Sequence, residues 1–462
     1  MTSIVPSQFK NRQKSPFSFT EEELNQDLIT DDSTILSFSE KIESINLLRL
    51  LKTIFQYYSL HFYWENQQQQ ESILAFGLAQ YLVLDQGDRF QKSQRFLDDC
   101  FNRIVCLGDC SPHLFLSFTF FENQKLLQPS ATIFLPTYEI VRRQETYYLI
   151  INVTIDEQEN IAVLRKQFFD HLEKSLADES FSYPVQKYKL QSDLTFNNSA
   201  DFIAAVELVL RSIDEKKLSK VVLAHALDIY AKANFNIIEA LKQLRLHYSD
   251  SHIFSFGNST GEAFLGASPE RLISIRNKQL VTDALAGSAP RGKTIEEDIL
   301  LAQQLLTNEK EIREHQSVKT FINSILQELG IQPECSGLKI LQLSNIQHLW
   351  TSIYAHLPPS IQPLEILQKL HPTPAVAGVP TNIACDRILE HEKFDRGLYA
   401  APLGWIDCEG NCEFIVGIRS ALIRGNHARL YAGAGIVSGS DPYRELAEIE
   451  LKFQVLLRAL GY

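Results

Sequence analysis

The chain has 462 residues, of which 45% are hydrophobic and 10% aromatic, enough to bury the core of one large domain or two ordinary ones. Its formal net charge of −12 argues against nucleic acid and anionic membrane surfaces as partners. The same charge would oppose a small anionic substrate, so we expect locally placed cations around any anion site.

The seven cysteines are an odd number, and the polar N-terminus carries no secretory signal, so we expect reduced thiols and a cytoplasmic protein. The runs CFNRIVCLGDC and CEGNC lack the C-x-x-C spacing of structural zinc sites and read as ordinary core or loop thiols. No apolar run is long enough to span a bilayer, so no membrane partner is expected.

In the first half, residues 1–35 read as a polar, flexible leader, and 36–195 as a β-rich N-terminal subdomain. A helical spacing of apolar residues predicts a helix from Glu40 to about Trp64. A second helix is expected over about 157–178, before a polar linker around SYPVQKYKLQSD. Three β-rich segments predict strands: HLFLSFTFF, ATIFLPTYEIV and TYYLIINVTI.

The second half, 196–462, is more regular. SADFIAAVELVLRSIDEKKL predicts a helix, and further helices are expected over about 293–328, 379–393 and 441–460. Strands are predicted in KVVLAHALDIY, HIFSFG, EAFLGAS, IQHLWTSIYAHL and CEFIVGIRSALI. Paired strands with grouped helices predict an α+β fold with mainly antiparallel sheets.

The segment AGAGIVSGSDPYRELAEIELK joins a glycine-rich strand to the last helix. Ser440 or Asp441 can cap that helix, which then carries Glu445, Glu448 and Lys452 on one face. One interpretation is a solvated stripe with a Glu448–Lys452 pair. The other is a Mg²⁺ site, because Mg²⁺ takes one or two carboxylates and keeps positions open for an anionic substrate.

Other segments offer further candidates. EKEIREHQSV places Glu311 and Glu314 within one helical turn, and SPERL places Glu270 directly after a strand. Lys220 opens an apolar strand, where a lysine is more often a snorkelling edge residue than a base. Arg419 lies within an apolar strand, so we expect it to face a carboxylate of the protein or of a ligand.

Together these segments resemble the chorismate-utilising enzymes over roughly residues 200–455. The matching segments, in order, are SKVVLAH, GEAFLGASPERL, DALAGSAPRG, EKEIREH, HPTPAVAGVP, FDRGLYAAPLGWID, FIVGIRSALI and AGAGIVSGSDPYRELAEIELK. The resemblance implies one large domain of packed, mainly antiparallel sheets flanked by helices, with the active site between them. The second half would be its chorismate-binding catalytic domain.

Within that family, aminodeoxychorismate synthases carry a nucleophilic lysine where this chain has Ala286. Anthranilate synthases typically read HPxGTxxGAP, whereas HPTPAVAGVP, with Ala375 in its TPA motif, resembles isochorismate synthases. That likeness implies isomerisation of chorismate without an amidotransferase subunit, for menaquinone, phylloquinone or siderophore synthesis, and favours a monomer. The alternatives are a salicylate synthase, which also eliminates pyruvate, and a non-catalytic chorismate-binding protein.

By resemblance, Lys220 is the general base and Glu270 the general acid, which requires a neutral lysine and a protonated carboxyl. Glu314 and Glu448 would bind Mg²⁺, with Glu311 and Glu445 acting through water. The resemblance also implies that Gly287, Ala375, Arg419, Gly433 and Lys452 contact the substrate. Relatives usually read KVVLAR, with an arginine at the position where this chain has His225. A histidine does not reproduce the bidentate pairing of an arginine, so the sequence does not say what replaces the contact of that arginine.

Overall fold

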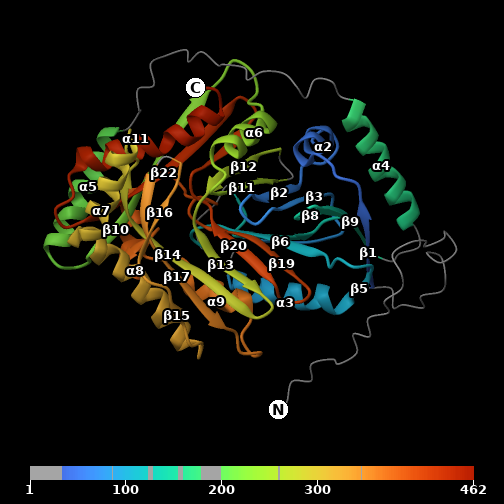
Figure 1. Cartoon of the computed structure of the whole chain (residues 1–462), viewed down its shortest axis with the longest axis horizontal. Coiled ribbons are helices and arrows are strands. Elements are labelled where there is room, and N and C mark those ends of the chain that lie inside the picture. Colours follow the sequence, from blue (N-terminus) through green and yellow to red (C-terminus); the bar gives the residue numbers. More distant parts are fainter. Residues whose placement is uncertain are drawn as a thin grey trace.

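The computed structural model describes residues 34–85, 87–122, 128–154, 160–177, 199–258, 261–344 and 346–462. Over these ranges two large β-sheets pack together, and helices flank them (Figure 1). The predicted α+β fold with mainly antiparallel sheets is confirmed. No helix within these ranges is long and apolar enough to cross a membrane.

The larger sheet has 12 strands. All its pairings are antiparallel except the parallel contact between its last two strands. Its spatial order is β18 (Gly378–Val379), β10 (Lys220–Tyr230), β22 (His427–Val437), β21 (Ser420–Arg424), β12 (Ala263–Ser268), β11 (His252–Gly257), β2 (His61–Asn66), β3 (Glu71–Phe76), β8 (Tyr138–Arg143), β9 (Thr146–Thr154), β1 (Ile35–Ile42) and β5 (Ile104–Leu107).

The second sheet has 10 strands, all in antiparallel pairs. Its order is β15 (Glu334–Cys335), β17 (Ile346–His356), β14 (Gln279–Pro290), β13 (Arg271–Arg276), β20 (Cys412–Val416), β19 (Pro402–Asp407), β6 (His113–Phe118), β7 (Ala131–Leu135) and β4 (Gln80–Leu84), while β16 (Lys339–Gln342) pairs with β17.

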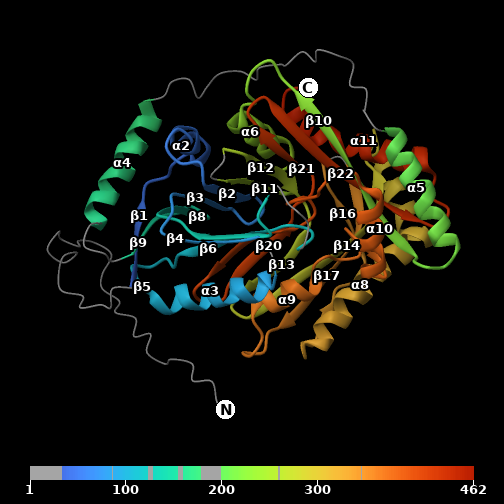
Figure 2. The same ribbon diagram turned by 180° about the vertical axis from the view of Figure 1, so that it is seen from behind.

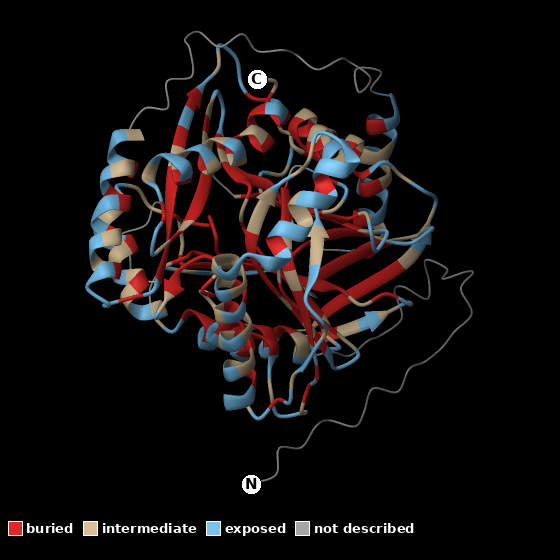
Figure 3. Cartoon of the chain, turned by 60° about the vertical axis from the view of Figure 1, so that its left-hand side comes forward, coloured by how far each residue is buried: buried red, intermediate tan, exposed pale blue. Residues whose placement is uncertain are grey.

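Both sheets contain strands from both halves of the chain. Strand β11 pairs with β2 in one sheet, and β19 pairs with β6 in the other. The sheets meet over an aromatic core in which the Phe62 and Phe115 rings lie 4.6 Å apart, and the buried residues concentrate in these strands (Figure 3). Hydrogen-bonded sheets thus extend across both parts of the chain. The division into two parts at residue 195 stays a prediction.

Ten helices lie within the described ranges, and Figure 2 shows several of them beside β10 and β22. They are α2 (Leu47–Ile54), α3 (Arg89–Arg103), α4 (Ile161–Ala177), α5 (Ser199–Asp214), α6 (Ile237–His247), α7 (Ile295–Thr307), α8 (Glu309–Glu328), α9 (Pro363–Leu370), α10 (Thr381–His391) and α11 (Pro442–Ala459). The predicted leader up to residue 33 and the whole of the predicted linker segment SYPVQKYKLQSD fall outside the described residues.

The helix predicted over 40–64 is wrong in its extent. Residues 35–42 pair with β9 as strand β1, and β2 begins at His61, so only α2 between them is helical. Asn46 starts that helix, where its side chain accepts a hydrogen bond from Arg49 N at 3.1 Å. Strand pairing with a distant segment therefore prevailed over the local helical spacing.

Candidate active site

Two neighbouring crossings between the sheets position the first site residues. The chain leaves one sheet after β12 and enters the other at β13, passing Glu270; it returns between β20 and β21, passing Arg419. The crossings are bonded together, since Val416 N donates to Glu270 O at 3.0 Å and Ala267 N donates to Arg419 O at 3.2 Å. An acid and a cation that are far apart in sequence are thereby fixed at one place.

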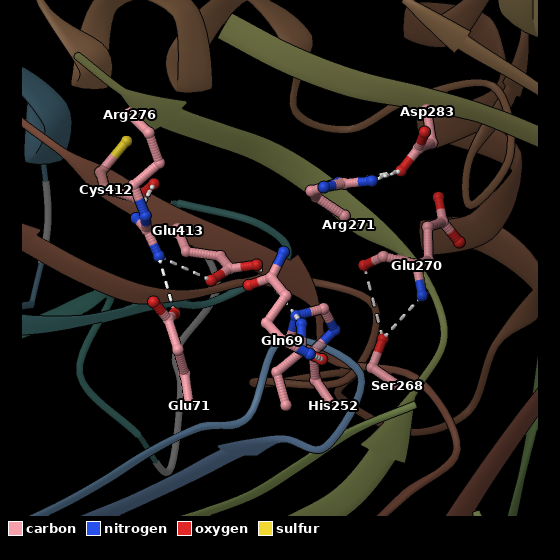
Figure 4. A network of polar contacts seen from close by, with 11 residues as sticks. Gln69, Glu71, His252, Ser268, Glu270, Arg271, Arg276, Asp283, Cys412 and Glu413 are labelled. Atoms are coloured by element: carbon pink, nitrogen blue, oxygen red, sulfur yellow. Dashed lines mark hydrogen bonds and ion pairs between the residues drawn. The ribbon is translucent and has the colours of Figure 1, made fainter. Parts of the chain in front are cut away.

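Glu270 is buried, with only 7% of its surface exposed. Its backbone N–H donates to Ser268 Oγ at 3.2 Å, while β13 leads away to Arg276, which lies between Glu71 and Glu413 (Figure 4). Burial raises the pKa of the Glu270 carboxyl to about 7, although nearby cations oppose the shift. This carboxyl can therefore hold or release a proton near neutral pH.

Lys220, the first residue of β10, is buried and not a snorkelling edge residue. Its Nζ donates to Glu314 Oε1 at 2.8 Å, and 4% of its side chain is exposed. Side chains alternate along a strand, so His225 points to the opposite face, where its ring lies near Phe202 and Phe453. His225 thus lies outside the site built around Lys220.

Lys220 adjoins a group of four glutamates from two helices, of which Glu314 contacts it directly. Burial, followed by the nearby Glu314 charge, raises the pKa of Glu311 on α8, and Glu448 adds to the shift. On α11, burial and then Glu448 raise the pKa of Glu445. Carboxylates that destabilise one another's charge across two helices form one acidic cluster.

The cluster is balanced by lysines. Lys452 Nζ lies 2.7 Å from Glu448 Oε1 and donates to Gly433 O, also at 2.7 Å. Burial acts to raise the pKa of Glu448, but the ammonium groups of Lys452, Lys310 and Lys220 outweigh it and lower that pKa. Within the described ranges, no three acidic, histidine or cysteine side chains form a ready-made metal cage. The donor chemistry nevertheless fits Mg²⁺, which prefers carboxylate oxygens.

Arg419 supplies a buried cation with free hydrogen-bonding capacity. Its Nη2 lies 3.4 Å from His348 Nε2, while Nη1 has no partner in the described structure. Burial lowers the pKa of Arg419 to about 10, so it stays charged at neutral pH. Burial, with Arg419 and Lys452, lowers the pKa of His348 to about 3, so that ring is neutral. No carboxylate of the described residues forms an ion pair with Arg419, which leaves a ligand as its expected partner.

Gly287 lies in a bulge of β14 between Ala286 and Ser288, with φ at +79°. A Cβ there would lie 3.2 Å from Glu311 O, and Ser288 N donates to Glu311 Oε2 at 3.1 Å. The absent side chain thus lets helix α8 approach the strand. His348 Nδ1 lies 3.3 Å from Gly287 O, so the bulge also orients the ring beside Arg419.

Two glycines of β22 keep space beside the lysines. A Cβ on Gly433 would lie 2.8 Å from the Tyr399 hydroxyl, and one on Gly435 would lie 3.2 Å from Lys220 Cε. Ala375 is half-buried in the segment before β18, which is tied to β10 by the bond from Val222 N to Ala377 O at 2.7 Å. Gly435 thus leaves space beside Lys220, and Gly433 leaves space beside the Tyr399 hydroxyl.

Sequence reasoning did not single out His348 or Tyr399. Tyr399 is buried, which raises its pKa, and the charge of Glu270 adds to that shift. The tyrosine lies within the segment FDRGLYAAPLGWID, so its signal was an aromatic residue inside a matching motif. His348 gave no local signal, because its role comes from the pairing of β17 with the β14 bulge.

A buried ion pair that sequence reasoning also missed supports β10. Arg396 and Glu392 pair at 2.5 Å with side chains 1% and 4% exposed. Arg396 donates to Val222 O at 2.7 Å and to Val376 O at 2.9 Å. Glu392 accepts from Ala224 N at 2.8 Å. The pair therefore fixes the strand that carries Lys220 and the segment that carries the TPA motif.

Replacing Arg396 by alanine should lower the free energy of unfolding by about 3–5 kcal/mol, because Glu392 would keep a buried charge without its partner. The matched control is Lys393→Ala, which removes an exposed pair with Asp201 at 2.9 Å. That change should cost about 1 kcal/mol or less. Urea unfolding measures the free energy of unfolding of both variants. Equal losses would show that the buried Arg396–Glu392 pair stabilises the fold no more than the exposed Lys393–Asp201 pair does.

The site thus combines a buried acid, a buried lysine, an acidic cluster and an anion-binding arginine between two sheets, as expected of an enzyme for an anionic substrate. The family model described as "Chorismate binding enzyme" matches residues 22–461. The chain belongs to this family.

Comparison with curated proteins finds relatives that cover up to 93% of this chain. Isochorismate synthase MenF of Bacillus subtilis is 30% identical over 449 residues, covering 93% of this chain and 94% of the relative. A salicylate biosynthesis isochorismate synthase of Pseudomonas aeruginosa is 40% identical over 274 residues, covering 59% of this chain and 57% of the relative.

Among solved structures, MenF, the menaquinone-specific isochorismate synthase of Escherichia coli, matches with a TM-score of 0.77 and 27% identity. The match covers 96% of this chain and 97% of that chain. Anthranilate synthase component I of Streptococcus pneumoniae matches with a TM-score of 0.70 and 20% identity, which shows the shared fold alone. The expected family fold is confirmed.

Proposed function

We propose that this protein is an isochorismate synthase, which isomerises chorismate to isochorismate. Water adds at C2 of the ring, the double bonds shift, and the hydroxyl at C4 leaves. The observation that carries this proposal is Glu270, a buried carboxyl with a pKa of about 7, within the electrostatic influence of the buried Lys220. Such a pair supplies the acid and the base that this reaction needs.

In the proposed mechanism, the neutral form of Lys220 accepts a proton from the attacking water, whose oxygen forms the new bond to C2. Glu270 donates a proton to the C4 hydroxyl, which departs as water when the C4–O bond breaks. One water enters and one leaves, so substrate and product are isomers. A pKa of about 7 leaves a large share of Glu270 protonated at neutral pH, as a general acid requires.

Chorismate carries two carboxylates, and the site offers separate cations for them. Arg419, with its unpartnered Nη1, would bind one carboxylate, assisted by Lys452. Glu314 and Glu448 would hold Mg²⁺, with Glu311 and Glu445 acting through water. When bound, the ion would supply positive charge for the other carboxylate at the acidic cluster.

Residue identities support isomerisation over amination. Ala286 stands where a lysine nucleophile is needed for a covalent amine mechanism, and Ala375 lies in the TPA motif. The named isochorismate synthases among the relatives match at 30–40% identity. Similarity to the MenF proteins extends over both halves of the chain, which favours menaquinone synthesis. We also propose a cytoplasmic monomer that needs no amidotransferase subunit.

Incubating the purified protein with chorismate and Mg²⁺ tests the proposal, with products separated by chromatography. Isochorismate should accumulate without release of pyruvate. Formation of salicylate with an equal amount of pyruvate would identify a salicylate synthase. Tight binding of chorismate without any turnover would identify a binding protein. Either of these outcomes would overturn the proposed activity.

Glu448→Gln should raise the Mg²⁺ concentration for half-maximal activity by at least about tenfold, because an amide offers the ion no negative charge. Activity is measured against Mg²⁺ concentration at saturating chorismate. The matched control is Glu450→Gln on the same helix, which lies about half a turn away and should keep the wild-type Mg²⁺ requirement. Unchanged Mg²⁺ dependence in Glu448→Gln would remove this residue from the metal site.

A further inference from the structure

The backbone of Arg419 has an unusual conformation. Its φ is +48°, in the left-handed region that residues with a Cβ seldom occupy. The residue is buried and lies between β20 and β21, outside the range of either strand. A conformation of this kind persists only where surrounding contacts impose it. The residues that make those contacts are therefore candidates for a role in placing Arg419.

Gly266 of β12 makes room for the Arg419 carbonyl group. In the pairing of β12 with β21, two neighbouring strands in Figure 2, Gly266 lies opposite Ser420. The next residue, Ala267, donates its N–H to Arg419 O at 3.2 Å. A Cβ on Gly266 would lie only 2.5 Å from that oxygen and 2.9 Å from the Phe254 ring. Any larger residue at this position must therefore displace the Arg419 backbone or the Phe254 ring.

Ser420 closes the turn on the other side of Arg419. Its side chain is buried, and its Oγ donates to Gly417 O at 2.9 Å. Gly417 O also accepts from Ala400 N at 3.0 Å, and Gly417 N donates to Ala401 O at 2.9 Å. The turn that contains Arg419 is thus tied both to itself and to a separate segment of the chain.

The Arg419 side chain, by contrast, makes few polar contacts of its own. Its Nη2 lies 3.4 Å from His348 Nε2, and its Nη1 has no partner in the described structure. The placement of the guanidinium group therefore depends largely on the backbone that carries it. An arginine whose position is fixed beforehand loses less freedom when it binds a carboxylate, so the same contacts yield a higher affinity.

We infer that Gly266 and Ser420 are positioning residues, which fix the backbone of Arg419 so that its guanidinium group is preorganised for a carboxylate of the substrate. Each acts through Arg419. Their effect is therefore on substrate affinity, and not on proton transfer by Lys220 or Glu270. The inference rests on the proposed function, because it takes chorismate as the ligand of Arg419.

Gly266→Ala should raise the KM for chorismate by about 10- to 100-fold, the range for weakened hydrogen bonds to a charged group, while kcat stays close to the wild-type value. Ser420→Ala, which removes one hydroxyl, should raise KM by about two- to tenfold. Steady-state kinetics at saturating Mg²⁺ measures both. The matched control is Gly257→Ala in β11, where a Cβ would lie 2.7 Å from Ser59 O. That crowding does not involve Arg419, so KM should be unchanged.

A double-mutant cycle tests the route of the effect. In an Arg419→Ala background neither Gly266→Ala nor Ser420→Ala should raise KM further, because the side chain that they position is gone. A further rise of the same size in that background would overturn the inference. A wild-type KM in folded Gly266→Ala and Ser420→Ala would overturn it as well. If Gly266→Ala does not fold, Ser420→Ala decides the question by itself.

Failure of the inference is distinguishable from failure of the proposed function. A wild-type protein that forms no isochorismate from chorismate would overturn the proposed function. An active wild-type enzyme whose KM is insensitive to these two substitutions would overturn the inference alone.

Discussion

Replacing Lys220 by alanine should lower kcat for chorismate isomerisation by on the order of 10²–10⁴, the usual contribution of a positioned general base. Lys220 is buried at the start of β10 and makes a 2.8 Å contact with Glu314, so its amine is held by the protein. Water by itself is a poor nucleophile, so the reaction needs a base such as this amine. Steady-state kinetics at saturating Mg²⁺ measures the loss.

Two further variants separate chemistry from charge. Lys220→Arg keeps a cation beside Glu314 but cannot act as a base, because arginine does not lose its proton at accessible pH. We expect it to be as slow as Lys220→Ala. Recovery of the rate in Lys220→Arg would mean that only the positive charge matters. Lys232→Ala, which changes an exposed lysine just beyond the strand, should keep wild-type kinetics.

Glu270→Gln should lower kcat by a similar 10²–10⁴-fold, because glutamine cannot donate the proton that lets the C4 hydroxyl leave. In the wild type the acid must be protonated. With a pKa of about 7, kcat/KM should be highest below pH 7 and fall about tenfold per pH unit well above it. Measuring kcat/KM from pH 6 to 9 checks this fall above pH 7, the basic limb of the pH profile. The basic limb should be absent from the residual activity of Glu270→Gln.

Asp283 offers a test of the cause of that pKa. Burial is the main reason for the raised pKa of Glu270, and the Asp283 charge adds to it. Asp283→Asn should therefore move the basic limb to lower pH. A limb that stays in place in Asp283→Asn and persists in Glu270→Gln would assign the titration to another group.

The same shift has a consequence for stability. The pKa of Glu270 is raised from 4.5 to about 7 in the folded protein, so the protonated form favours folding. Its stabilising contribution is complete below pH 4.5 and is lost as the pH rises through 7. Glu270→Gln, which stays neutral, should therefore be at least as stable as the wild type at pH 8, by urea unfolding.

Several local features could be predicted because their causes are local. Asp441 caps α11 by accepting hydrogen bonds from Tyr443 N and Arg444 N, and Pro442 begins that helix, as the sequence indicated. The helix predicted over about 293–328 divides at Asn308, whose side chain caps α8. That division was not predicted, although asparagine is a common cap.

The site was predicted less completely. Motif resemblance identified four residues of the candidate site: Lys220, Glu270, Glu314 and Glu448. In the structure Lys220 contacts Glu314, and its charge acts on both Glu270 and Glu448. Neither His348 nor the buried Arg396–Glu392 pair was found, because each depends on contacts between distant segments. Lys220 itself reads from the strand pattern alone as an edge residue, and only its burial against Glu314 distinguishes it.

The sequence by itself determined the family likeness, the antiparallel α+β character and the residue types of the proposed acid, the proposed base and the carboxylate cluster. Motif order, strand composition and helix caps are all contained in short segments. Tertiary structure alone decided which of those groups meet. The adjacent crossings from β12 to β13 and from β20 to β21 bring Glu270 and Arg419 together. Burial there, which no short segment encodes, moves the Glu270 pKa to about 7.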